Sequence, residues 1–167
     1  NFQLLKWQQE VFKDTTRFKV VAAGRRCGKS RLSAVTLLIE ALNCPEGSSV
    51  MYVAPTLGQA RSIIWDLLHD LGRPVIKSSH VNNLEITLIN GRKILVRGAD
   101  NPDSLRGVSL VYLVLHRFKC LLSTEHSLEI INVFRLRALV AILLLSGTLV
   151  LVKRDLLLHR TMSSCYL

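Results

Sequence analysis

Acidic residues are scarce in this sequence, and its cysteines have no paired spacing. The 167 residues include 12 Asp and Glu against 22 Lys and Arg, which gives a formal net charge of +10. A chain this basic suits a polyanion such as DNA or RNA, or an acidic membrane surface. The four cysteines form no C-x-x-C pair and have no zinc-like spacing with histidine. The sequence therefore argues against a zinc site and for the reduced thiols of a cytosolic protein.

Long apolar segments are also missing. The uncharged run at residues 138–152 has 15 residues, whereas a membrane-spanning helix needs about 20. We expect a buried strand or strand pair there, and a membrane segment is the alternative. The N-terminal stretch NFQLLKWQQEVFKD is too polar for the apolar region of a signal peptide, so none is expected.

Proline and glycine almost disappear from the last third of the chain. All four prolines and eight of the nine glycines lie in residues 1–115, whereas residues 116–167 have no proline, one glycine and 14 leucines. Turn-forming residues are thus concentrated in the first part. This composition predicts a globular core over residues 1–115 and a leucine-rich tail, 116–167, that either completes its sheet or has another origin.

Predicted strands and helices alternate through the first part. Apolar residues at helical spacing predict helices near residues 4–12, 29–43 and 57–71, and short apolar runs predict buried strands at 18–24 and 49–55. This order is typical of an α/β fold, in which helices cover a parallel sheet.

A hairpin and a further strand follow. Two alternating runs joined by Asn90 and Gly91 predict a β-hairpin, and residues 109–115 predict another buried strand. Thr56, three residues before Gln59, predicts a capping box at the start of the helix over 57–71.

A glycine-containing loop lies between the first predicted strand and the second predicted helix. Its sequence fits the phosphate-binding pattern G-x-x-x-x-G-K-[ST], with alanine in place of the first glycine. Glycine lets backbone approach phosphate oxygens closely, and the amides of a helix N-terminus attract anions. The pattern predicts that Lys29 contacts the β- and γ-phosphates and that Ser30 binds Mg²⁺. The predicted nucleotide-binding residues of the loop are Ala23, Gly24, Arg25, Arg26, Cys27, Gly28, Lys29 and Ser30.

Two further features have open alternatives. Arg25 and Arg26 either stabilise charge on the transferred phosphoryl group, as catalytic residues beside Lys29, or are solvated or bind DNA. Gln8 has the amide geometry that pairs with adenine, and Trp7 is placed to pack beside the base. An ordinary N-terminal helix explains both of these residues almost as well.

Together these pieces resemble the ATPase domain of the large terminase subunit of tailed phages. The matching stretches cover about residues 3–115 in the family's order: WQQEVF, FKVVAAGRRCGKSRLSA, VMYVAPTLGQARSIIWDLL, KSSHVNNLEITLINGRKILVRGADNPDSLRG and LVYLVL. The resemblance implies a P-loop NTPase of three layers, with a mainly parallel sheet and an inserted β-hairpin. By position, Gln8 corresponds to the glutamine that reads adenine and Ala23–Ser30 to the Walker A loop. Arg106 lies in the SLRG segment near the nucleotide and receives no role.

The resemblance also implies a function. The family uses ATP and Mg²⁺ to drive viral DNA into a procapsid in the cytoplasm of the bacterial host. The implied partners are double-stranded DNA, the small terminase subunit and the portal protein, and no membrane is involved. Residues 116–167 have neither the clustered carboxylates nor the length that we expect for the family's separate C-terminal nuclease domain.

The sequence departs from this family after Leu115. The family's strand ends in Asp-Glu, where aspartate holds Mg²⁺ and glutamate orients the attacking water. Here His116 and Arg117 follow instead, so we expect poor hydrolysis. Loss of the motif, the changed composition and the early end together predict a frame shift near residue 116, in a phage or prophage gene.

Residues 143–148, LLLSGT, oppose that idea. In the family a similar strand ends in a small hydroxyl residue that couples hydrolysis to movement. If the tail is genuine, Thr148 has that role and Glu125 or Glu129 acts as a substitute carboxylate. Two other functions stay open: a helicase-like DNA-dependent ATPase, and a non-enzymatic remnant that binds nucleotide or DNA.

Overall fold

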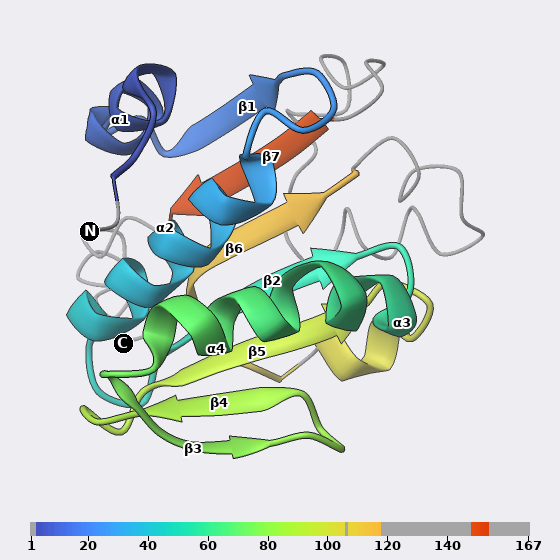
Figure 1. The fold of residues 1–167 in the computed structure, drawn as a ribbon. Coiled ribbons are helices and arrows are strands. Elements are labelled where there is room, and N and C mark those ends of the chain that lie inside the picture. Colours follow the sequence, from blue (N-terminus) through green and yellow to red (C-terminus); the bar gives the residue numbers. More distant parts are fainter. Residues whose placement is uncertain (1–2, 106, 118–147, 154–167) are drawn as a thin grey trace, which may run out of the picture.

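The computed structural model describes residues 3–105, 107–117 and 148–153. Helices and strands alternate early in the chain, and strands dominate later (Figure 1). The helical elements are α1 (Lys6–Lys13), α2 (Lys29–Asn43), α3 (Leu57–Ala60), the π-helical turn η1 (Arg61–Trp65), α4 (Asp66–Gly72) and the 3-10 turn η2 (Pro102–Leu105). The strands are β1 (Phe18–Ala22), β2 (Ser49–Ala54), β3 (Ile76–His80), β4 (Glu85–Leu88), β5 (Lys93–Gly98), β6 (Leu110–His116) and β7 (Thr148–Lys153).

The described strands form one mixed sheet in the order β1-β7-β6-β2-β5-β4-β3. β2 pairs in parallel with both β5 and β6, and the other neighbours pair antiparallel. It follows that β1, β2, β3, β5 and β6 point in one direction, while β4 and β7 point in the other. The carboxyl ends of β1, β6 and β2 therefore meet at one edge, at the right of Figure 1. Open α/β sheets bind their ligands at this kind of edge.

β7 separates β1 from β6. Its backbone register pairs Val21 with Leu149 on one side and His116 with the same Leu149 on the other. Because Val21 and His116 share this partner, the carboxyl ends of β1 and β6 lie level with each other.

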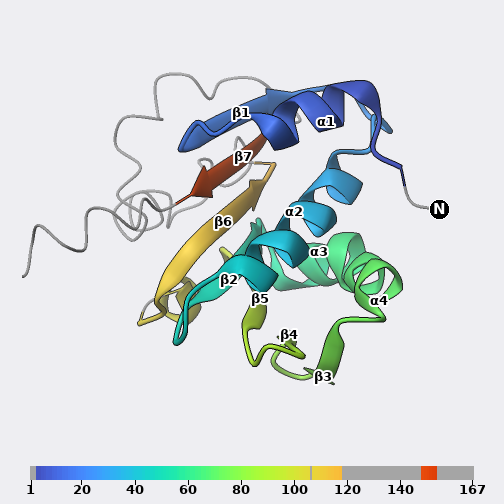
Figure 2. The same ribbon diagram turned by 90° about the vertical axis from the view of Figure 1, so that its left-hand side faces the viewer.

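The helices α2, α3 and α4 lie on the same face of the sheet (Figure 2). Ala34 and Leu37 of α2 are fully buried, and they belong to one apolar cluster with Val50 and Tyr52 of β2. Full burial of a side chain the size of leucine stabilises the fold by roughly 1.5–3 kcal/mol. Met51, the residue between these two on β2, is also fully buried, so the central strand is covered on both faces.

The helix expected over residues 57–71 is present and runs without a break through α3, η1 and α4. Thr56 begins it: its hydroxyl accepts a hydrogen bond from the Gln59 amide at 3.2 Å. The reciprocal half of the expected capping box is missing, since the buried Gln59 Oε1 has no hydrogen-bond partner among the described residues. The π-helical turn η1 in the middle was not expected from the apolar spacing.

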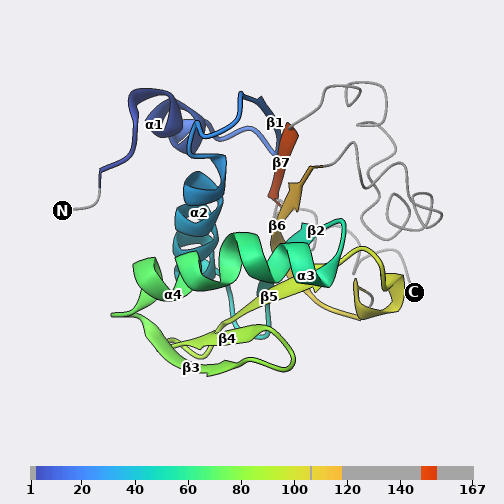
Figure 3. The same ribbon diagram turned by 45° about the vertical axis from the view of Figure 1, so that its right-hand side comes forward.

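The predicted hairpin is confirmed. β4 and β5 pair antiparallel, and the Gly91 amide donates to the Leu88 carbonyl oxygen at 2.9 Å with Gly91 at a φ of 77°. Asn90 also fixes the turn to α2, because its Nδ2 donates to the carbonyl oxygens of Ala41 and Leu42, each at 3.1 Å. Figure 3 shows β3 and β4 below α4, far from β1.

The α/β class with an inserted hairpin is therefore confirmed. In the described ranges, no helix combines the length and the apolar character needed to cross a membrane. Of the uncharged run at 138–152, residues 138–147 lie outside the described ranges, and the remainder forms most of β7.

Candidate nucleotide-binding site

The loop between β1 and α2 connects a strand to the N-terminus of a helix, as the sequence predicted. Gly28, the residue before α2, has a φ of 83°, in the left-handed region that favours glycine. The first hydrogen bond of the helix runs from the Leu32 amide to the Gly28 carbonyl oxygen at 3.0 Å. The amides of Lys29 and Ser30 therefore have no acceptor within the helix, and they sit at the positive end of its dipole.

Lys29 folds back over this loop. Its Nζ donates to the Ala23 carbonyl oxygen at 2.6 Å and also to the Gly24 carbonyl oxygen. The ammonium group thus lies at the start of the loop, although its residue lies at the end. The predicted contact of Lys29 with the β- and γ-phosphates stays a prediction.

Gln8 of α1 holds the other end of the loop. Its side chain is 1% exposed, and its Nε2 donates to the Gly28 carbonyl oxygen at 3.0 Å. Its Oε1 accepts from the Leu5 amide at 2.9 Å, at the start of α1. Both ends of the amide are engaged here, and its predicted contact with adenine stays a prediction.

A shallow hollow of about 430 Å³ lies beside the loop, between α1 and β1. Trp7 and Val11 line it from α1, and Val20, Ala23 and Cys27 line it from β1 and the loop. Its mainly apolar walls suit the planar base of a nucleotide. The prediction that Trp7 packs beside a base is compatible with this placement.

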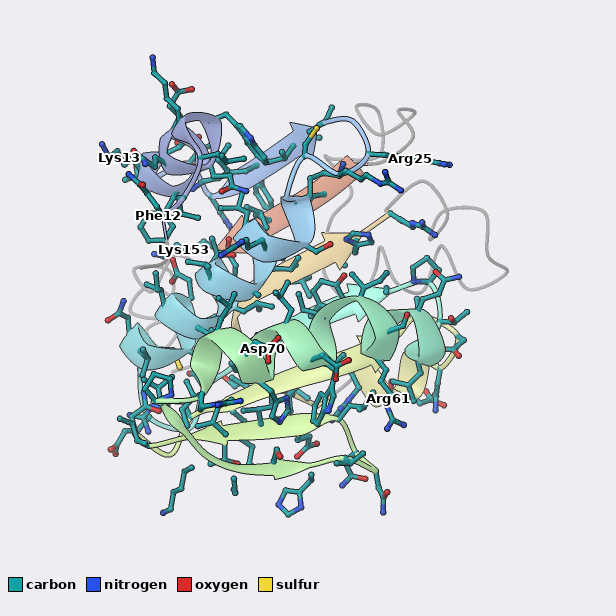
Figure 4. All side chains as sticks on the ribbon, in the orientation of Figure 1. Phe12, Lys13, Arg25, Arg61, Asp70 and Lys153 are labelled. Carbon is teal, nitrogen blue, oxygen red and sulfur yellow. The ribbon has the colours of Figure 1, made fainter. Side chains whose placement is uncertain are left out.

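The two loop arginines are exposed. Figure 4 shows Arg25 extending from the loop into solvent, near the carboxyl ends of the strands. Arg26 has a φ of 61°, which is uncommon for a residue other than glycine. The Cys27 thiol contacts the Arg25 carbonyl oxygen at 3.6 Å. The roles predicted for both arginines stay predictions.

His116 ends β6 at the same edge of the sheet. It is 9% exposed, and its Nδ1 has no hydrogen-bond partner among the described residues. Burial, the Arg117 guanidinium and the Lys29 ammonium together lower the pKa of His116 to about 4. Its imidazole is therefore neutral at physiological pH.

Tyr52 is a polar neighbour of His116 that the sequence analysis missed. The two rings are 5.9 Å apart between centroids, and the fully buried Tyr52 hydroxyl also has no partner among the described residues. Burial raises the pKa of this hydroxyl, which stays protonated. A tyrosine inside the otherwise apolar SVMYVA strand was the available signal.

The described residues do not fit the magnesium site of the predicted motif. They contain no group of three metal-ligating side chains, and imidazole and guanidinium stand where the motif needs two carboxylates. Of the predicted metal site only Ser30 is present. Arg106, Glu125 and Glu129 lie outside the described residues, and for Thr148 the structure gives the backbone position, opposite Ala22.

Comparison with solved structures gives the same architecture. The chain superposes on the large terminase ATPase domain of Thermus phage P74-26 with a TM-score of 0.64 and 23% sequence identity, covering 82% of this chain and 62% of that one. A variant of the same domain gives a TM-score of 0.62 at 22% identity, with the same coverage. The chain has a terminase ATPase domain fold. It spans less than two thirds of the length of these terminase domains. No protein-family model matches it, and no curated protein matches it significantly.

Proposed function

We propose that this chain binds ATP in the Ala23–Ser30 loop and is the nucleotide-binding part of a DNA-packaging ATPase of the terminase type. The position of the Lys29 ammonium, hydrogen bonded at the start of the loop, is the observation that carries the proposal. In that place it neutralises phosphate oxygens while the amides of α2 bind them. The terminase ATPase domain fold supports the same function.

The chain hydrolyses ATP slowly under this proposal. Neither His116 nor Arg117 provides the carboxylates that hold Mg²⁺ and orient water. Removal of a positioned general base typically costs about 10²–10⁴-fold in rate. Ser30 remains the proposed contact for any magnesium that arrives with the nucleotide. The presence of His116 and Arg117 in place of the two carboxylates also favours a second candidate function, a nucleotide-binding protein without ATPase activity.

The proposed macromolecular partners follow from charge and fold. A formal net charge of +10 favours double-stranded DNA as the polyanion. The small terminase subunit and the portal protein are the proposed protein partners, in the cytoplasm of a bacterial host. A helicase-like ATPase is the alternative of the same class.

A binding measurement with matched variants tests the nucleotide site. Lys29→Ala is expected to weaken ATP binding by at least about tenfold, because a charge-assisted hydrogen bond to phosphate is lost. Lys77→Ala removes an equal charge from the exposed surface of β3 and is expected to leave the affinity unchanged. Equal affinity of the Lys29→Ala variant and the wild type would contradict the proposal. Phosphate release measured on the same samples separates an ATPase from a binding protein.

A further inference from the structure

The arginine after β6 lies beside the phosphate loop. His116 and Val21 face the same residue of β7, so Arg117 follows β6 at the level where Ala22 leads into the loop. One strand separates the two chains here, and two strand spacings amount to about 10 Å. An extended arginine side chain covers most of that distance, and a bound triphosphate covers the rest.

Within the described ranges, the charged groups that act on His116 are both positive. The charged groups that act on the buried His116 ring are Arg117 and Lys29, and both lower its pKa. Arg117 is exposed and forms no ion pair with any described residue. A guanidinium that is free of carboxylates is available for an anion.

A cation in this place conflicts with a metal ion. In the predicted motif, carboxylates attract Mg²⁺ to the phosphates, and the ion neutralises their charge. Here a permanent positive charge repels a divalent cation, and the neutral imidazole adds no compensating charge. Arginine binds phosphate with two parallel hydrogen bonds and so supplies the charge that the metal would bring.

We propose that the Arg117 guanidinium binds the triphosphate in place of the metal ion, so that the nucleotide binds without magnesium. This inference rests on the proposed ATP binding. It concerns affinity and involves no bond cleavage. The site thus needs no metal ion to hold the phosphates, with Lys29 on one side of them and Arg117 on the other.

Nucleotide affinity with and without magnesium tests this proposal. A fluorescent ATP analogue is titrated into the full chain in excess EDTA and again in excess Mg²⁺. For the wild type, the two dissociation constants are expected to agree within about threefold. Arg117→Ala is expected to weaken binding in EDTA on the order of tenfold, and Arg73→Ala, at the exposed end of α4, is expected to have no effect.

A charge reversal provides the opposite test. Arg117→Glu places a carboxylate next to His116, so binding in EDTA is expected to disappear and to return when Mg²⁺ is added. Because Arg117 is exposed, both variants are expected to melt at the wild-type temperature.

The other outcomes are distinct. Wild-type binding that requires Mg²⁺ overturns the inference and leaves the proposed function intact. Binding in EDTA that Arg117→Ala leaves unchanged also overturns it. Absence of binding under both conditions overturns the proposed function itself.

Discussion

The side chain of Gln8 donates a hydrogen bond from Nε2 to the carbonyl oxygen of Gly28 at 3.0 Å. Twenty positions separate the two residues in sequence, and the bond joins α1 to the loop residue that precedes α2. Gln8 is 1% exposed. If its side chain is removed, we therefore expect no water molecule to take over this hydrogen bond. The shape of the loop therefore depends on a residue that belongs to another element.

Replacement of Gln8 by alanine is expected to destabilise the protein by about 0.5–1.5 kcal/mol for each hydrogen bond lost. The Gly28 carbonyl oxygen keeps only its bond from the Leu32 amide, and the Leu5 amide loses its acceptor. ATP affinity is expected to fall as well, because the loop is no longer held. Chemical denaturation and nucleotide titration measure the two effects. Gln9→Ala is the control: its Nε2 donates to the Leu4 carbonyl oxygen at 2.8 Å, away from the loop. An equal loss of ATP affinity in both variants would argue against the link.

Gly28 is expected to resist substitution for two separable reasons. Its φ of 83° disfavours any residue with a Cβ, and an added Cβ would lie 2.6 Å from Gln8 Nε2. Gly28→Ala should therefore cost more than the roughly 1–2 kcal/mol of the left-handed conformation alone. In a Gln8→Ala background the contact is gone, and the cost should fall toward that value. A double-mutant cycle by urea unfolding measures the difference, and additive effects would refute the close contact.

His116 makes the stability of the protein depend on pH. The folded protein lowers the pKa of this histidine from 6.5 to about 4. The unfolded chain therefore binds more protons between these values, and stability falls as the pH drops from about 6.5 to about 4. The loss amounts to at most about 3 kcal/mol.

The variant His116→Phe keeps an aromatic ring and removes the titration. Its free energy of unfolding is expected to decline less than that of the wild type over the same pH range. Urea titrations at several pH values compare the two proteins. Parallel pH profiles would show that another group causes the decline.

Asn90 is expected to contribute stability beyond its role in the turn. Its amide satisfies two carbonyl oxygens at the end of α2, which have no amide partners within the helix. Asn90→Ala should lower the melting temperature, with a cost of about 1–2 kcal/mol. Asn82→Ala, in the exposed turn between β3 and β4, is the matched control. Equal melting temperatures for the two variants would show that the hydrogen bonds from Asn90 to α2 contribute no stability.

Local signals predicted the loop between β1 and α2 and the β4–β5 hairpin. Gly28 and Gly91 both adopt positive φ values. Because this backbone conformation favours glycine, the glycines in the sequence indicate the helix start and the tight turn. Thr56 could also be predicted as the N-cap, because its hydrogen bond from the Gln59 amide joins residues only three positions apart. The continuous apolar spacing of residues 60–71 predicted the helix but not its π-helical turn.

Long-range pairings were beyond the sequence pattern. Nothing in the run at 138–152 indicates that Thr148 lies opposite Ala22, because period-two alternation specifies faces and not neighbours. The sequence left open whether Gln8 contacts adenine or belongs to an ordinary helix. Its hydrogen bond to the Gly28 carbonyl oxygen depends on where α1 meets the loop. The tyrosine in SVMYVA stands out in the sequence, but its contact with His116 does not, because the two rings approach each other only when β2 pairs with β6.

The position of β7 also bears on how the protein matures during synthesis. In the described sheet, β1 has β7 as its strand neighbour and lies at the border of the sheet. The ribosome must therefore have passed residue 153 before β1 can form its hydrogen bonds with β7. The proposed ATP binding is thus expected to begin late in synthesis, long after the loop itself has left the exit tunnel.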